Sequence, residues 1–248
     1  MKVVNIKGIS KTGKTTTTVA IIEELIKRGY TVGSVKEIHY EAFTIEKAGS
    51  NTDLHKKAGA DPVTAHGLSE TDVMYQTRLS VEKVLDHYDT DYVIIEGHCD
   101  VNCPNIVTGR VPADLKGYRD DLTFAVSGVI ANDTDRVDGL PAINGMTNVE
   151  KLVTLIEQIV PDRMPNYFPG CCSACGTDCR GMTRRLMDGT AVREDCVIHQ
   201  QKTALIVDGK SIPMVPFVQN MLRSVTTALV SEFDGCDNAE EIVIKLRK

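Results

Sequence analysis

Eight residues near the start of the chain have the types and spacing of a phosphate-binding loop. The segment Gly8-Ile9-Ser10-Lys11-Thr12-Gly13-Lys14-Thr15 matches the Walker A pattern G-x-x-x-x-G-K-[ST]. It lies between an apolar run, Val3 to Ile6, and an amphipathic helical stretch. Small residues let backbone N–H groups converge on a phosphate, and the helix directs its positive dipole end at the same charge. The segment therefore predicts a nucleoside triphosphate site.

Individual side chains of this loop have predicted roles. Lys14 would bridge β- and γ-phosphate oxygens, and the Thr15 hydroxyl would ligate Mg²⁺. Thr16 is expected to reach the α-phosphate. The predicted nucleotide-binding residues of the loop are Gly8, Ser10, Lys11, Thr12, Gly13, Lys14, Thr15 and Thr16.

Two carboxylates are candidates for catalysis beside Lys14. Glu96 ends the apolar run that starts at Tyr92, where a Walker B acid would hold Mg²⁺ or orient the attacking water; capping a turn is the alternative. Asp53 lies in a stretch expected to act as a switch, although a helix N-cap is equally compatible. Lys36 and His39, near the end of a second predicted strand, could face the phosphates, although a lone histidine near an apolar strand is more often structural.

Asn132 and Asp135 are the residues from which we predict the base of the bound nucleotide. They follow a predicted strand and have the Asn-x-x-Asp spacing of the residues that recognise guanine in P-loop GTPases. In those proteins the Asp accepts hydrogen bonds from the base. The usual stacking lysine is replaced by Asp133, and an Asx-rich turn would produce the same residues. The spacing favours GTP without excluding ATP.

A second segment of the chain is rich in cysteines. Four of the eight cysteines fall within nine residues near three glycines, which suits a [4Fe–4S] cluster held by Cys171, Cys172, Cys175 and Cys179. A zinc site is the alternative, because a Cys-x-x-Cys and a Cys-x-x-His pair offer the set Cys172, Cys175, Cys196 and His199. Independent thiols are the third possibility. A further pair, Cys99 and Cys103, could meet its counterpart across a two-fold axis or be incidental.

The elements that must position these residues alternate between strand and helix. A helix after the loop buries an apolar face, and a strand from Thr31 to Lys36 follows, so the chain predicts a parallel sheet with right-handed crossovers. Further predicted elements are strands over 92–95 and 122–130 and helices over 80–87 and 148–160. The fold class is α/β: a P-loop NTPase with a mainly parallel sheet flanked by helices.

Prolines at 161, 165 and 169 indicate a linker. They divide the chain into a P-loop domain over 1–162, a cysteine-rich metal-binding segment over 163–202 and a small β-α-β tail over 203–248. The tail is predicted from strands over 204–207 and 241–246 and a helix over 217–233. The tail would form a small α+β module with the cysteine segment, or it would pair with its counterpart in a dimer.

Several blocks of the first 160 or so residues resemble the MobB family of P-loop GTPases, tied to making the guanine dinucleotide form of the molybdenum cofactor. The blocks are the Walker loop, Val32–Lys36 with Ile38–Tyr40, Gly49–His55 with Ala58–Ala60, and Ile94–Gly97. The resemblance implies a dimeric GTPase of the metallocofactor-maturation type. The chain departs from the family habit at Lys11, where a small residue is usual, and at His98-Cys99-Asp100, where an aromatic residue and a lysine are usual.

The composition limits the classes of partner that we expect for this chain. A net charge of −6 over 248 residues gives no broad basic face for nucleic acid, and no apolar run reaches the length of a membrane span. The first residues lack a secretory signal, so a cytoplasmic location and reduced thiols are expected.

The sequence therefore predicts an NTPase that couples a nucleotide switch to a metal-bearing module during metallocofactor assembly. Molybdopterin guanine dinucleotide synthesis is the first candidate pathway. The expected partners are a second copy of the chain and either a cofactor-biosynthesis enzyme or a client metalloenzyme. Two alternatives stay open: a metal or cluster carrier whose hydrolysis times delivery, and an ATP-gated iron–sulfur electron donor.

Overall fold

The computed structural model describes residues 1–99, 101–164, 175–196, 203–207, 210–212, 214, 216–236 and 242–244. The chain divides into two compact units, Met1–Arg163 and Met164–Lys248. Each unit is described by itself.

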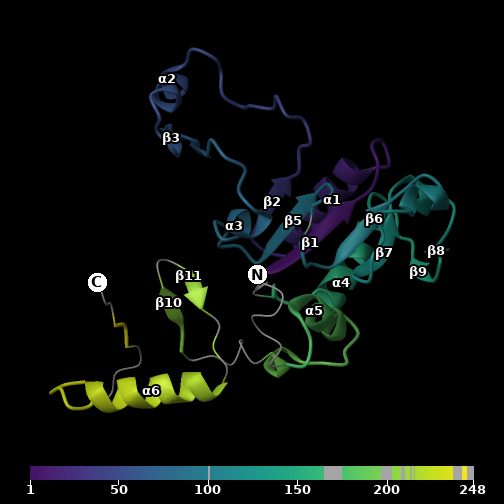
Figure 1. The fold of residues 1–248 in the computed structure, drawn as a ribbon. Helices are drawn as coiled ribbons and strands as arrows, with labels where there is room; N and C mark the ends of the chain where they lie inside the picture. Colours follow the sequence, from purple (N-terminus) through teal and green to yellow (C-terminus); the bar gives the residue numbers. More distant parts are fainter. Residues whose placement is uncertain are drawn as a thin grey trace. The chain divides into compact units, whose positions relative to one another are not determined.

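A five-stranded parallel sheet forms the centre of the first unit (Figure 1). Its strands lie in the order β2 (Val32–Lys36), β5 (Tyr92–Glu96), β1 (Lys2–Lys7), β6 (Asn105–Thr108) and β7 (Thr123–Ser127). All four neighbouring pairs are parallel. Because the carboxyl ends of parallel strands lie at one edge, Glu96 and the loop after β1 lie at the same edge. The predicted α/β fold with a mainly parallel sheet is confirmed.

The two faces of this sheet are covered differently. Val3, Val93 and Ile95 pack against α3 (Val81–Leu85) and against a segment with Cys99, Val101 and Cys103. On the other face α1 (Lys14–Lys27) contacts β1, β2 and β5 and also packs against α4 (Val149–Ile159). Burial on both faces explains why β5 is apolar up to Glu96. Cys99 and Cys103 are 6% and 4% exposed inside this core, so neither is presented to a second subunit in this conformation.

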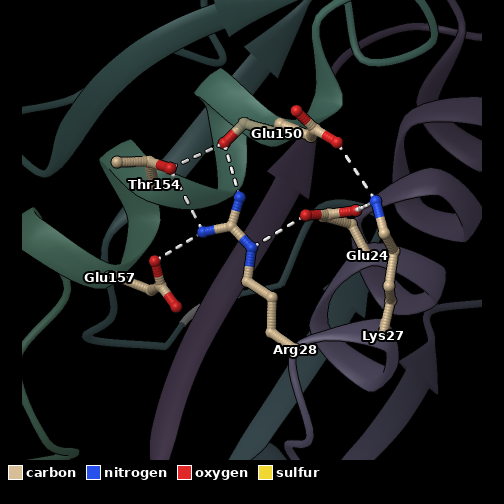
Figure 2. A network of polar contacts seen from close by, with 6 residues as sticks. All are labelled: Glu24, Lys27, Arg28, Glu150, Thr154 and Glu157. Atoms are coloured by element: carbon tan, nitrogen blue, oxygen red, sulfur yellow. Dashed lines mark hydrogen bonds and ion pairs between the residues drawn. The ribbon is translucent and has the colours of Figure 1, made fainter.

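A polar network fastens the end of α1 to α4 (Figure 2). Arg28 donates from Nε to Glu24 Oε1 at 2.8 Å and from a terminal nitrogen to Glu157 Oε2 at 2.6 Å. Lys27 bridges to Glu150 at 3.1 Å, and the hydrogen bond from Arg28 lowers the pKa of Glu24. The network fixes the direction of α1, whose other end follows the phosphate-binding loop.

The remaining elements of the first unit are short. The connection between β2 and α3 holds α2 (Asn51–Lys57), which contacts an antiparallel hairpin of β3 (Val63–His66) and β4 (Thr71–Met74). A second hairpin pairs β8 (Arg136–Val137) with β9 (Leu140–Pro141). Two 3₁₀ turns, η1 (Pro112–Leu115) and η2 (Val129–Asn132), flank β7. The strand predicted over 122–130 stops at Ser127, because Gly128 turns the chain with a φ of 81°.

The second unit contains α5 (Cys179–Met187), η3 (Arg193–Asp195), an antiparallel pair of β10 (Leu205–Val207) with β11 (Lys210–Ile212), and α6 (Pro216–Val230). Residues 242–244 form no strand, so the closing strand predicted over 241–246 is not seen there, and the rest of it lies outside the described residues. Across the described part of the chain, no helix combines the length and apolar character needed to cross a membrane.

Candidate nucleotide-binding site

The predicted phosphate-binding loop lies between β1 and α1, as the Walker pattern requires. Gly8 and Gly13 have φ angles of 139° and 96°, which L side chains rarely adopt. A Cβ on Gly8 would lie 2.4 Å from the carbonyl oxygen of Thr108. Glycine at position 8 is therefore required by close approach to β6, and at position 13 chiefly by its backbone conformation.

Thr12 fixes the centre of the loop. Its hydroxyl donates to Ile9 O at 2.8 Å and lies 2.7 Å from the Thr108 hydroxyl. Its carbonyl accepts a hydrogen bond from the Val129 N–H at 3.2 Å. Thr12 is fully buried, and these hydrogen bonds hold the loop against β6 and the turn after β7.

A cavity of about 1060 Å³ opens over the loop. Most of the predicted nucleotide-binding residues line it, together with Glu96, and so do Lys36 and His39. Glu37, Gly97, His98, Gly117 and Tyr118 complete the far wall. The cavity lies at the upper end of the roughly 300–1,000 Å³ usual for small-molecule sites, enough for a nucleotide's phosphates with space beyond them.

The two predicted magnesium ligands meet in this cavity. Thr15 Oγ1 donates to Glu96 Oε1 at 2.7 Å, although the residues are 81 positions apart. Lys36 forms an ion pair with the same oxygen. A hydroxyl and a carboxylate are the hard oxygen ligands that Mg²⁺ prefers, and this carboxylate already attracts a cation. The donor set therefore fits a magnesium ion bound together with phosphate oxygens.

Lys14 points back over the loop, and its ammonium group donates to the carbonyl of Ile9. Burial and the neighbouring charge of Lys36 lower the pKa of Lys14, while Glu96 opposes this shift. An anionic phosphate would offset both effects, because an opposite charge favours the protonated amine.

Asp53 does not line the cavity. It lies in the first turn of α2, where Ser50 is the N-cap and accepts a hydrogen bond from the Asp53 N–H at 3.1 Å. The Asp53 carboxylate accepts from Gly49 N–H at 2.7 Å and from Lys57 at 2.6 Å. The hydrogen bond from Lys57, and then that from Gly49, lower the pKa of Asp53. In this conformation the side chain stabilises its own helix.

Asn132 is bound to a loop beside α1. Asn144 Nδ2 donates to Asn132 Oδ1, and Asn144 Oδ1 accepts from the N–H groups of Met146 and Thr147 at 2.7 and 3.0 Å. Met146 lines a second cavity, of about 600 Å³, together with Thr15, Thr16 and Val19 of α1. Asn132 thus positions one wall of a space adjoining the phosphate loop. Asp135 lines neither cavity.

Tyr118 is a wall residue that sequence reasoning missed. Its ring meets that of His98 edge-on, with centroids 5.8 Å apart. The loop carrying Tyr118 is held by Asp120, which accepts from Lys7 at 2.8 Å and from Asn105 at 2.8 Å. Although burial opposes its ionisation, these hydrogen bonds lower the pKa of Asp120 to about 2. A lysine ending the strand before a Walker loop was the available signal, but the pattern carries no information about its partner.

The predicted metal ligands of the second unit are only partly described. Cys171, Cys172 and His199 lie outside the described residues. Cys175, Cys179 and Cys196 pack with Met164 and Met182 in one cluster. Among the residues that the structure describes, no group of three or more His, Cys, Asp or Glu side chains is arranged to hold a metal ion.

Comparison with known proteins agrees with this geometry. The model of the family described as MobB, molybdopterin guanine dinucleotide synthesis protein B, matches residues 3–127. A relative from Methanocaldococcus jannaschii, named as a molybdopterin-guanine dinucleotide biosynthesis adapter protein, is 29% identical over 99% of this chain and 97% of its own length. A similarly named Bacillus subtilis protein is 27% identical over 47% of this chain and 70% of its own. The crystal structure of Bacillus subtilis MobB matches 66% of this chain and 100% of its own with a TM-score of 0.52 at 21% identity, which supports the fold.

Proposed function

This chain belongs to the MobB family, and from that membership we propose that it is a magnesium-dependent nucleoside triphosphatase acting as an adapter in molybdopterin guanine dinucleotide synthesis. The names of its relatives carry the pathway. The chemistry is supported by the cavity over the Walker loop, and above all by the hydrogen bond between Thr15 and Glu96. These residues come from different elements and meet where a triphosphate-bound Mg²⁺ would lie.

In the proposed reaction the loop amides and Lys14 bind the β- and γ-phosphates. Thr15 and Glu96 would hold Mg²⁺, which neutralises charge on the phosphate oxygens. Water then attacks the γ-phosphorus while the bond between that phosphorus and the β–γ bridging oxygen breaks. The products are a nucleoside diphosphate and inorganic phosphate. Lys36 lies beside Glu96 and would move to the γ-phosphate when the metal takes its place.

We propose GTP as the preferred nucleotide. Asn132 supports this preference, because it anchors the Met146 loop beside Thr16, where a ribose and base would extend from the α-phosphate. Asp135 follows at the guanine-reading spacing. The proposed partners are a second copy of the chain and the enzyme that makes or receives the cofactor, so that hydrolysis would time a handover.

For the second unit we retain the proposal of a [4Fe–4S] cluster on Cys171, Cys172, Cys175 and Cys179. Its support is the spacing of the thiols and the presence of Cys175, Cys179 and Cys196 in one sulfur-rich cluster. Soft thiolates are the ligands that iron–sulfur clusters and zinc prefer. Zinc on Cys172, Cys175, Cys196 and His199 is the competing occupant. A bound cluster would also suit the carrier and electron-donor alternatives.

The proposal is tested by nucleotide binding to the Lys14→Ala variant. Removing the ammonium group deletes the charge that faces the β/γ oxygens, so calorimetry with Mg²⁺ should show at least about a 100-fold weaker affinity for GTP. The parent should bind GTP more tightly than ATP. Lys83→Ala, which removes an exposed lysine of α3 outside both cavities, is the matched control. An unchanged GTP affinity in Lys14→Ala would contradict the proposed phosphate site. Equal affinities of the parent for GTP and ATP would contradict only the proposed preference for guanine.

A further inference from the structure

Lys11 has a backbone conformation that its residue type disfavours. Its φ is 61°, in the left-handed region where glycine is the usual residue. In the described part of the chain only one other non-glycine residue, Asp138, has a positive φ, of 48°. Asp138 lies in the tight turn between β8 and β9, where aspartate is commonly tolerated. Lys11 does not lie in such a turn, and its conformation is that of the phosphate-binding loop.

The neighbours of Lys11 prevent its backbone from relaxing. Thr12 is fully buried and is hydrogen-bonded to Ile9, to Thr108 and to the Val129 N–H. The backbone that follows Lys11 is thus held in place by contacts with β6 and with the turn after β7. An unfavourable conformation that persists in this way at a binding site points to a function for the side chain.

The side chain of Lys11 is exposed and lines the cavity over the loop. Two other lysines line the same cavity, but each has a partner: Lys14 donates to Ile9 O, and Lys36 forms an ion pair with Glu96. Lys11 has no ion pair or hydrogen bond to any described residue. It is therefore the cation of this cavity that a ligand can bind without breaking an existing contact.

We propose that Lys11 is a catalytic residue whose ammonium group stabilises the charge on the γ-phosphoryl oxygens during hydrolysis. This role rests on the proposed nucleotide hydrolysis. As the bond to the β–γ bridging oxygen breaks, negative charge spreads over the transferring group and the leaving oxygen, and a positive charge supplied from the same chain lowers the barrier. The water proton goes to the released phosphate, so Lys11 contributes charge and exchanges no proton.

The experiment compares Lys11→Gly, Lys11→Met and Lys11→Arg in the full chain. Steady-state phosphate release from Mg²⁺·GTP should show about a 100-fold lower kcat for the glycine and methionine variants. KM and the calorimetric Kd should change little, because the charge acts mainly in the transition state. Arginine should restore most of the rate. Lys11→Gly should also keep or raise Tm, by up to about 2 °C, since glycine accepts this φ.

Lys83→Met is the matched control, because it removes an exposed ammonium group outside the cavity and should leave kcat unchanged. Parent-like kcat in Lys11→Gly and Lys11→Met would overturn the inference and leave the proposed hydrolysis intact. So would a loss that appears as weaker binding, or a lowered Tm in Lys11→Gly. A parent that binds GTP through Lys14 but releases no phosphate would overturn both this role and the hydrolytic part of the proposed function, while leaving the binding part in place.

Discussion

The phosphate loop and the thiol segment are both short and rich in chemical groups, but different contacts hold them in place. The loop is fixed from outside itself, because Gly8 and Thr12 contact Thr108 of β6 and Thr12 also binds the turn after β7. The described thiols of that segment, Cys175, Cys179 and Cys196, pack with one another and with side chains that belong to no strand: Met164, Met182, Leu186 and Ala191. The first site is thus built by long-range support, whereas the second relies on local packing.

The first unit also buries more of its apolar side chains than the described part of the second unit does. The first unit buries whole strands, including all five residues of β5. In the described part of the second unit, the buried apolar side chains are Met164, Met182, Cys196 and Met214, while α6 leaves Phe217, Met221, Val225 and Leu229 exposed. Small units with thin cores are commonly stabilised by a metal. The comparison therefore suggests that a ligand shapes the second site, whereas the first site exists before its ligand binds.

The largest effect that would test this contrast is the loss of metal from Cys179→Ser. Anaerobically purified protein should contain iron and acid-labile sulfide, and this variant should lose nearly all of both, because one of four thiolate ligands is removed. Protease resistance of the second unit should fall with the cluster. GTP affinity should remain, since the first site does not depend on the second.

Cys236→Ser is the control for that experiment, because Cys236 follows α6 and lies outside the thiol cluster. One zinc per chain that survives Cys179→Ser would replace the iron–sulfur proposal with the set Cys172, Cys175, Cys196 and His199. A metal-free parent with a protease-resistant second unit would contradict the idea that a ligand shapes this unit.

Glu96→Gln is the next largest change, and it probes the preformed site. An amide keeps the shape of the side chain but cannot neutralise a metal, so kcat for GTP hydrolysis should fall about 100-fold or more while binding persists through Lys14 and the loop amides. The melting temperature should change little, because Thr12 and Gly8 fix the loop independently. Glu70→Gln, an exposed glutamate of the β3–β4 turn, is the control; parent-like turnover in Glu96→Gln would make Glu96 a structural residue.

Sequence alone predicted the parts of this site that are contiguous or end an apolar run. The Walker loop was recognisable because its eight residues are adjacent, and Glu96 because β5 is apolar until it ends. The inner strand β6 was missed, since Asn105 and Thr108 are polar and only Ile106 and Val107 separate them. Those polar residues are buried because each has a specific partner in the folded sheet, Asp120 and Thr12 respectively.

The far wall of the cavity was also missed, for a related reason. Lys7 and Asp120 are 113 positions apart, and nothing in the pattern around either residue identifies the other. Asp53 shows the opposite case, because the carboxylate predicted to act in a switch is bound by Lys57 of its own helix and by Gly49, just before that helix. Short-range patterns identified the loop and several of the elements, whereas strand β6 and the partners across the sheet required the structure.

The smallest predicted effect concerns the partly buried ion pair between Lys7 and Asp120, which supports the far wall. The pKa of Asp120 is lowered from 3.8 to about 2 in the folded protein, so its ionised form contributes about 2 kcal/mol of stability. A lowered folded-state pKa gives stability that is present above the unfolded pKa near 4 and is lost as the pH falls through about 2. Asp120→Asn should therefore lower the free energy of unfolding by about 2 kcal/mol at pH 7.

Urea unfolding of the parent and of Asp120→Asn between pH 7 and pH 2 measures this contribution. The difference between the two proteins should be constant down to about pH 4 and shrink below it, as Asp120 of the parent becomes protonated. Asp89→Asn removes a carboxylate on an exposed turn and should show no such pH-dependent difference. A difference for Asp120→Asn that stays constant down to pH 2 would mean that its hydrogen bonds, and not its charge, hold the Tyr118 loop. The support of the first site would then be independent of electrostatics, which would sharpen its contrast with a thiol site that depends on a bound ligand.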